Sequence, residues 1–98
     1  MPELPEVETI LRSLKKRLLG RTIERVEVFS DKVIREPNPE QFVEELSGKT
    51  IDDMERRGKY LVFRLSGSLA LVVHLRMTGR LLLVASDIPR DEYTHVVF

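Results

Sequence analysis

A series of short runs rich in branched and aromatic residues fills the chain after Thr50 and constrains its fold most. Four of these runs are KYLVFRL, SLALVVHL, RLLLVAS and THVVF. Glycine and serine separate them, and the segments SGS and MTGR are typical of tight turns. The pattern predicts antiparallel strands joined by short connections.

The first twenty residues have a helical periodicity instead. Apolar side chains recur there at three- and four-residue spacing: Val7, Ile10, Leu11, Leu14 and Leu18. One apolar stripe of this kind predicts an amphipathic helix that packs one side against a sheet. Pro5 suits the first turn of such a helix, and Gly20 suits its end.

The segments between this helix and Thr50 are mixed. TIERVEVFS, residues 22–30, alternates and predicts a half-buried strand, and DKVIREPNPE predicts a turn-rich loop. PEQFVEELSG predicts a short helix that starts near Pro39 and ends at Gly48. The expected fold is therefore α+β, an antiparallel β-sandwich flanked by an N-terminal helix and a second short helix. The final run, HVVF, has no turn or cap, so we expect a truncated chain.

Composition bounds the class of protein. The chain has 98 residues, of which 42% are hydrophobic and 33% charged, as expected for one small globular domain. It has no apolar run of about 18 residues, so we expect no membrane span. It has no cysteine, which excludes disulfides and thiolate metal sites and favours a reducing, cytoplasmic location.

Charge is unevenly distributed, although the formal net charge is zero. Residues 31–53 hold three basic and seven acidic side chains, a balance of −4. Residues 54–80 hold six basic side chains and one acidic, a balance of +5. A basic segment of this kind is either a solvated surface or a patch that faces phosphates, and composition leaves both open.

Three separated motifs suggest a function: PELPEVET at the start, RRGKY ending at Tyr60, and HLRMTGRL from His74. In their order and spacing they resemble the N-terminal domain of the formamidopyrimidine-DNA glycosylase family, over essentially all 98 residues. That family excises oxidised purines such as 8-oxoguanine and formamidopyrimidines, and then cleaves the abasic strand. The sister group, endonuclease VIII, has PEGPE at the start, so Leu4 favours the first family.

The resemblance implies catalytic roles for Pro2, Glu3 and Lys59. Once Met1 is removed, Pro2 carries a free secondary amine that attacks the sugar C1′ and forms a cationic iminium, or Schiff base. Glu3 would protonate the ribose ring oxygen. Lys59 would contact the phosphate beside the lesion and donate a proton during β-elimination. Without the resemblance, the pattern favours a structural role for Pro2, as a stiff residue that precedes the helix.

The resemblance also implies contacts with DNA. Met77 would fill the hole that a flipped base leaves in the stack, and Glu6 would lie near the lesion pocket. His74 is expected to contact a phosphate, with a buried, hydrogen-bonded histidine as the rival interpretation. Tyr93 stands where the family often has the first histidine of a His-x-His-Val sequence, and its phenol could donate to a phosphate.

The two arginines before Lys59 are less well defined. Of Arg56 and Arg57, we expect one to be structural and the other, Arg57, to face DNA. A run of basic residues before a turn is, on its own, more often a solvated surface.

Residues 1–98 would then be an incomplete N-terminal catalytic domain, without the family's helical DNA-binding region and four-cysteine zinc finger. We expect no cofactor or metal in this chain, damaged double-stranded DNA as partner, no membrane association, and a monomer when full length. If Met1 stays attached, the Pro2 nitrogen is an amide and cannot react. Three alternatives remain: a non-catalytic nucleic-acid-binding module, an endonuclease VIII-like glycosylase for oxidised pyrimidines, and a domain whose open sheet edge recruits a protein.

Overall fold

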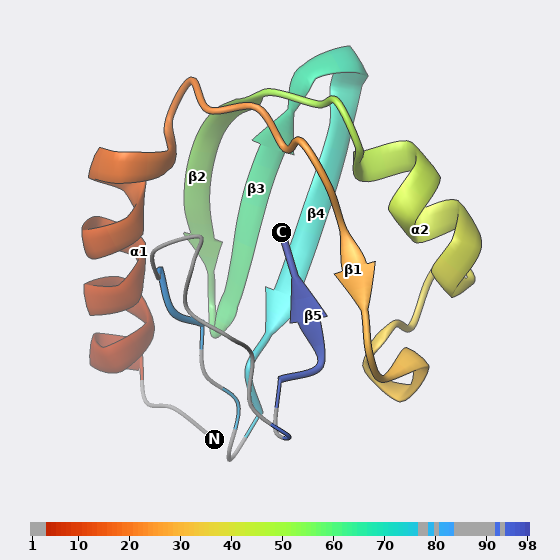
Figure 1. Ribbon diagram of the computed structural model, residues 1–98. Helices are drawn as coiled ribbons and strands as arrows, with labels where there is room; N and C mark the ends of the chain where they lie inside the picture. The colour runs from red at the N-terminus through yellow and green to blue at the C-terminus, as the bar shows by residue number, and fades with distance from the viewer. Residues whose placement is uncertain (1–3, 77–78, 80, 84–91, 93) are drawn as a thin grey trace. The chain divides into compact units, whose positions relative to one another are not determined.

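The computed structural model describes residues 4–76, 79, 81–83, 92 and 94–98, and Figure 1 shows its helices and strands. The chain divides into two compact units, Met1–Arg21 with Thr50–Val84 and Thr22–Lys49 with Ala85–Phe98. Each unit combines one α-helix with antiparallel strands. The predicted α+β class is confirmed.

A three-stranded antiparallel sheet forms the centre of the first unit. Its strands are β2 (Ile51–Arg57), β3 (Tyr60–Leu65) and β4 (Leu69–His74), in the order β2-β3-β4. The turn Gly58–Lys59 joins β2 to β3, and a 3₁₀ turn, Ser66–Ser68, joins β3 to β4. The predicted SGS connection is thus confirmed, with Gly67 at a φ of 75° that glycine adopts without strain.

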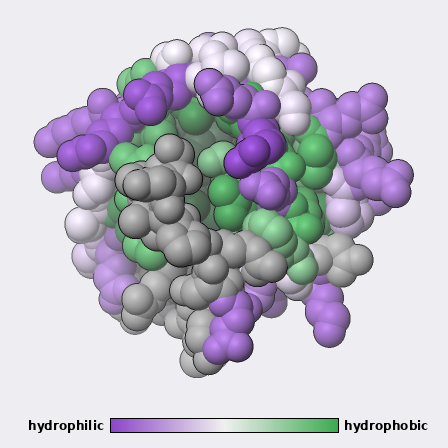
Figure 2. All heavy atoms as spheres, viewed as in Figure 1, coloured by the Kyte–Doolittle hydropathy of each residue, from purple (hydrophilic) through white to green (hydrophobic). Residues whose placement is uncertain are grey.

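The two faces of this sheet differ in chemistry. Successive side chains of a strand point to opposite faces, and directly paired residues share a face. Met54 pairs with Phe63, and both lie on a buried face with Leu61, which is 1% exposed. The opposite face carries mostly polar side chains: Glu55, Arg57, Tyr60, Arg64 and His74. Figure 2 shows hydrophobic side chains, in green, among the hydrophilic ones on the side viewed in Figure 1.

The N-terminal helix, α1 (Leu4–Leu18), packs chiefly against β2. Its buried side chains are Val7, Leu11 and Leu14, the centre of the predicted apolar stripe. The chain leaves the helix at Gly20, whose φ is 81° and whose N–H donates to the Ile51 carbonyl at 2.8 Å. The predicted helix and its end are confirmed.

Two ion pairs join α1 to β2. Glu8 lies 2.9 Å from Arg56, and Lys15 lies 3.1 Å from Asp53. Seven residues of helix span about 10.5 Å, and three residues of strand span about 10 Å. The two spacings match when helix and strand run in opposite directions, so both pairs can form at once and are consistent with the register that the apolar packing of α1 on β2 sets.

The second unit holds a shorter sheet and the second helix. Strand β1 (Glu27–Val28) pairs antiparallel with β5 (Val96–Val97), and a 3₁₀ turn, Asp31–Val33, follows β1. Helix α2 (Pro39–Leu46) begins as predicted, because the Asn38 side chain accepts a hydrogen bond from the Gln41 N–H at 2.9 Å.

Two predicted strands are wrong in extent. Of residues 22–30, only Glu27–Val28 form a strand, because Ile23 pairs its backbone elsewhere: its N–H donates to Lys49 and its carbonyl accepts from Gly48. The run at 80–86 is not a strand at 81–83, its described part, where Leu82 is 70% exposed. An apolar run indicates strand propensity, but a ladder also needs a neighbour with free backbone groups.

None of the helices in the described part of the chain has the length and apolar character needed to cross a membrane.

Replacing Leu61 with alanine should lower the free energy of unfolding by about 2–5 kcal/mol, because a fully buried leucine leaves a cavity. Leu82→Ala is the matched control, since this 70% exposed side chain should change the value by no more than about 0.5 kcal/mol. Chemical denaturation of both variants measures the difference. Equal losses would show that β3 is not the centre of the core.

Candidate functional site

The turn that carries Lys59 is a two-residue hairpin between paired Arg57 and Tyr60. Gly58 holds its first position with a φ of 59°, where hairpins of this length favour glycine. Lys59 follows, half-buried, at the end of the sheet. The sequence motif RRGKY therefore encodes a tight turn that fixes the backbone of Lys59 between two paired strands.

Arg56 ties this turn to α1. Its Nε donates to Glu8 Oε1 at 2.9 Å, and a terminal guanidinium nitrogen donates to the Gly58 carbonyl at 3.0 Å. Its side chain is 32% exposed, so water screens these contacts only in part. One guanidinium thus connects the N-terminal helix with the peptide next to Lys59, and we call this contact the Arg56 bridge.

Glu8 is held in its charged form. The Arg56 hydrogen bond, then that of Arg12 at 3.1 Å, lowers the pKa of Glu8 below its ordinary value. A carboxylate with a lowered pKa contributes stability above its unfolded-state pKa and loses it as the pH falls through the folded-state value. The Arg56 bridge is therefore intact at neutral pH and weakens in acid.

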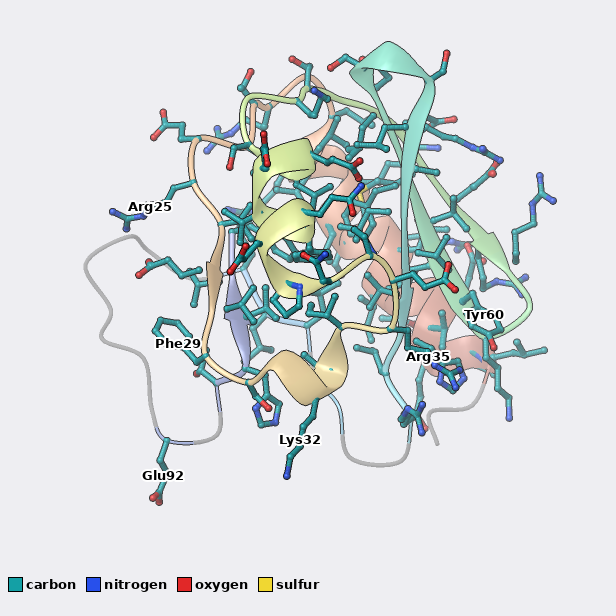
Figure 3. The ribbon with its side chains drawn as sticks, turned by 90° about the vertical axis from the view of Figure 1, so that its right-hand side faces the viewer. Arg25, Phe29, Lys32, Arg35, Tyr60 and Glu92 are labelled. Atoms are coloured by element: carbon teal, nitrogen blue, oxygen red, sulfur yellow. The ribbon has the colours of Figure 1, made fainter. Side chains whose placement is uncertain are left out.

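A row of three side chains crosses the polar face of the sheet beside the Lys59 turn. Arg57 of β2 pairs with Tyr60 of β3, and Tyr60 pairs with His74 of β4. Because directly paired residues share a face, all three lie on the same side. The Tyr60 and His74 rings are in contact, with centroids 4.7 Å apart and planes tilted by 44°. We call Arg57, Tyr60 and His74 the hairpin row, and Figure 3 labels Tyr60 at this end of the sheet.

The positive charge of residues 54–80 is partly neutralised on this face. Glu55 accepts hydrogen bonds from Arg64, the shorter at 2.6 Å, and lies 3.6 Å from Arg57. Ion pairs among the described residues do not involve Lys59 or Arg76. These two cations and the 70% exposed Arg57 are the charges that a phosphate could meet at the end of the sheet.

The chain turns sharply after β4. Arg76 has a φ of 60°, in the left-handed region, and the Gly79 N–H donates to the Leu75 carbonyl at 2.9 Å. A Cβ added to Gly79 would overlap the Leu75 carbonyl oxygen, so only glycine fits there. The predicted turn MTGR falls mostly outside the described residues and stays a prediction.

The structure brings together some of the predicted site residues. Lys59, Arg57 and His74 share one end of the sheet, and Glu6 lies exposed in the first turn of α1. His74 is half-buried beside Tyr60, so the rival interpretation of a buried histidine is wrong. Four predicted residues lie outside the described residues: Pro2, Glu3, Met77 and Tyr93.

Sequence reasoning missed two contributors, Glu8 and Tyr60. In the sequence, Glu8 is an ordinary acidic residue near the start of a helix. No local pattern indicates that it pairs with Arg56, 48 residues away. Tyr60 could have been found, because Tyr60 and His74 stand at equal distances on either side of the predicted turn at Gly67. The structure also distinguishes the roles of the two arginines: Arg56 is the structural one, and Arg57 is exposed.

Metal ligation has no support in the described part of the chain, where no three His, Asp or Glu side chains cluster as a metal site would require.

Comparison with known proteins identifies relatives over the whole chain. Residues 1–98 match the family described as formamidopyrimidine-DNA glycosylase N-terminal domain. The chain is 51% identical to a formamidopyrimidine-DNA glycosylase of Carboxydothermus hydrogenoformans and covers 37% of that protein. It is 54% identical to one from Moorella thermoacetica and covers 36% of it. All of this chain is aligned in both comparisons.

Solved structures give the same result. A Lactococcus lactis Fpg in complex with a Fapy-dG-containing DNA superposes with a TM-score of 0.91 at 42% identity, over 96% of this chain and 35% of that one. The same enzyme bound non-covalently to DNA with an AP site superposes with a TM-score of 0.91 at 42% identity. That comparison covers 97% of this chain and 36% of the other.

The two neighbouring arginines provide a matched test of the Arg56 bridge. Arg56→Ala should lower the free energy of unfolding at neutral pH, because Glu8 and the Gly58 carbonyl lose their donor. Arg57→Ala should stay within about 0.5 kcal/mol of the wild type. Chemical denaturation at several pH values measures both.

The pH dependence separates the bridge from a general effect of losing an arginine. The deficit of Arg56→Ala should shrink below about pH 4.5, as Glu8 is protonated in the wild type as well. A deficit that is the same at every pH, or equal losses in the two variants, would contradict the assignment.

Proposed function

The chain belongs to the formamidopyrimidine-DNA glycosylase family, and from that premise we propose that it forms the catalytic N-terminal part of a base-excision repair enzyme. The proposed enzyme is a DNA glycosylase with AP lyase activity. It would remove oxidised purines, 8-oxoguanine and formamidopyrimidines, from damaged double-stranded DNA and then cleave the strand. A full-length monomer in the cytoplasm is the expected form.

The chain spans little more than a third of the relatives it matches, 37% and 36% of the two bacterial proteins. We therefore propose that residues 1–98 are one part of the enzyme and that helical DNA-binding and zinc-finger regions complete it. The chain has no cysteine, so its residues do not fit a four-cysteine zinc site.

The observation that most supports this proposal is the Arg56 bridge. Helix α1 begins at Leu4, directly after the predicted catalytic pair Pro2–Glu3. Arg56 joins that helix to the turn of Lys59, the third predicted catalytic residue. The Arg56 bridge thus links the helix that follows the chain terminus with the turn of a lysine 57 positions after Pro2.

The proposed chemistry starts at the chain terminus. The Pro2 amine attacks C1′ of the damaged nucleotide, and the electrons of the glycosidic bond leave with the base. The base takes up a proton, and the Pro2 nitrogen releases its own, which frees the nitrogen lone pair to open the sugar. Glu3 protonates the ring oxygen as the sugar opens. The product is an iminium that is cationic without added protons. Loss of a C2′ proton then sends electrons into the iminium, and the 3′ phosphate leaves.

The remaining residues would hold the DNA. Lys59 would contact the phosphate beside the lesion and donate a proton during elimination, and His74 and Arg57 would contact the backbone from the hairpin row. Met77 would occupy the gap left by the flipped nucleotide, and Tyr93 would donate to a phosphate. Glu6, exposed in the first turn of α1, would lie near the lesion pocket.

Two observations support the proposed lesion class. Among the similar solved structures, the Lactococcus lactis enzyme is bound to DNA containing Fapy-dG, an oxidised purine. Leu4 in PELPE also departs from the PEGPE of endonuclease VIII.

Parallel assays with an 8-oxoguanine duplex and an oxidised-pyrimidine duplex compare the two activities. Faster excision of the pyrimidine would favour the endonuclease VIII-like alternative.

Borohydride reduction of the full-length protein mixed with an abasic duplex should trap a covalent adduct on Pro2. Peptide mass analysis identifies the attachment site. A variant with one residue inserted before Pro2, so that its nitrogen is an amide, should form no adduct. Attachment to a lysine in the unaltered protein would refute the assignment of Pro2, and a folded protein that traps nothing would favour a non-catalytic DNA-binding module.

Lys59→Ala should slow strand cleavage by about 10²–10⁴-fold, the usual effect of losing a positioned proton donor. Lys32→Ala is a suitable control, because Lys32 lies exposed in the 3₁₀ turn after β1 and points away from the ribbon (Figure 3). Single-turnover cleavage of an abasic duplex measures both rates. Equal rates in the two variants would remove Lys59 from the mechanism.

A further inference from the structure

We propose that Tyr60 is a positioning residue, whose ring holds the His74 imidazole in the orientation from which it donates to a DNA phosphate. This inference rests on the proposed function, because it assigns His74 the phosphate contact described above. Tyr60 would act through His74 and need not touch DNA itself.

The contact between the two rings is well defined. Tyr60 and His74 are direct partners in the β3–β4 ladder, on the polar face of the sheet. Their ring centroids lie 4.7 Å apart with a tilt of 44°, within the range in which aromatic rings attract each other. The ladder fixes both backbones, so the contact restricts the side-chain torsions of His74.

His74 needs such a restriction because of its position. It is the last residue of β4, half-buried on the polar face, and the chain turns at Arg76 two residues later. A side chain there, without a neighbour, would exchange between rotamers and lose that freedom when it bound a phosphate. A ring that selects one rotamer in advance reduces this entropic cost.

The ring of Tyr60, and not its hydroxyl, provides this restriction. The hydrogen bonds formed among the described residues do not include the Tyr60 hydroxyl, whereas its ring contacts His74. The residue is 48% exposed, so its hydroxyl can be hydrated while its ring stays against His74. Phenylalanine should therefore replace Tyr60, and leucine should not.

The test compares affinities of the full-length protein for an abasic-analogue duplex. Tyr60→Ala should weaken binding about three- to tenfold, the value of an aromatic pair, and Tyr60→Phe should stay within about twofold of the wild type. Val72→Ala is the control, since Val72 is 57% exposed on the same face and strand as His74. Circular dichroism and thermal melts establish that each variant is folded.

A double-mutant cycle separates positioning from a direct contact. In a His74→Ala background, Tyr60→Ala should cause no further loss of affinity, because the residue it positions is gone. An equal loss in both backgrounds would show that Tyr60 acts on DNA by itself and would overturn the inference, while leaving the proposed function intact.

Side-chain NMR tests the ring contact without DNA. In the wild type and in Tyr60→Phe, the His74 ring protons should be shifted upfield by the neighbouring ring, and the shift should vanish in Tyr60→Leu. Signals are assigned from the spectrum of His74→Gln. Absence of the shift in the wild type would overturn the inference. If the shift is present but His74→Ala leaves affinity unchanged, the phosphate role of His74 fails, and the inference fails with it.

Discussion

The Arg56 bridge is the polar interaction that connects the N-terminal helix with the turn of Lys59. Helix α1 and the hairpin β2–β3 are separated by more than thirty residues of sequence, and the packing of Val7, Leu11 and Leu14 holds the helix on the sheet. Arg56 and Lys15 each find a carboxylate on the opposite element, at spacings that match in helix and strand. These part-exposed pairs add to the packing contact, and the Arg56 bridge links the helix to the Lys59 turn.

The pairing register of the strands decides which side chains lie together on the polar face of the sheet. In an antiparallel ladder, side chains are grouped by pairing and not by sequence distance, so Arg57, Tyr60 and His74 form one row although they span eighteen residues. A slip of one residue would send His74 to the buried face. Gly58 and Gly67, both at positive φ, close the two turns at the lengths that keep this register.

Much of the first unit could be predicted from the sequence, because its signals are local. The apolar stripe that includes Val7, Leu11 and Leu14 predicts the helix. The strand runs separated by glycine and serine predict the β2–β3–β4 meander. The failures occurred where pairing is not local. Ile23 looked like a strand residue but exchanges hydrogen bonds with Gly48 and Lys49, which lie beyond α2. β-Propensity describes the preference of a single residue for extended backbone, whereas a β-ladder also requires a second strand to pair with.

The sequence by itself determined the chemistry available to this protein: a proline at the second position, a lysine in a Gly-Lys turn, and no cysteine for metal. It also indicated the family, since three motifs occur in the expected order. Only the tertiary structure decided which arginine is structural and which ring stands beside His74. The reason is physical: Glu8 and Arg56 are 48 residues apart, and only the packing of helix on sheet brings their charges within 2.9 Å.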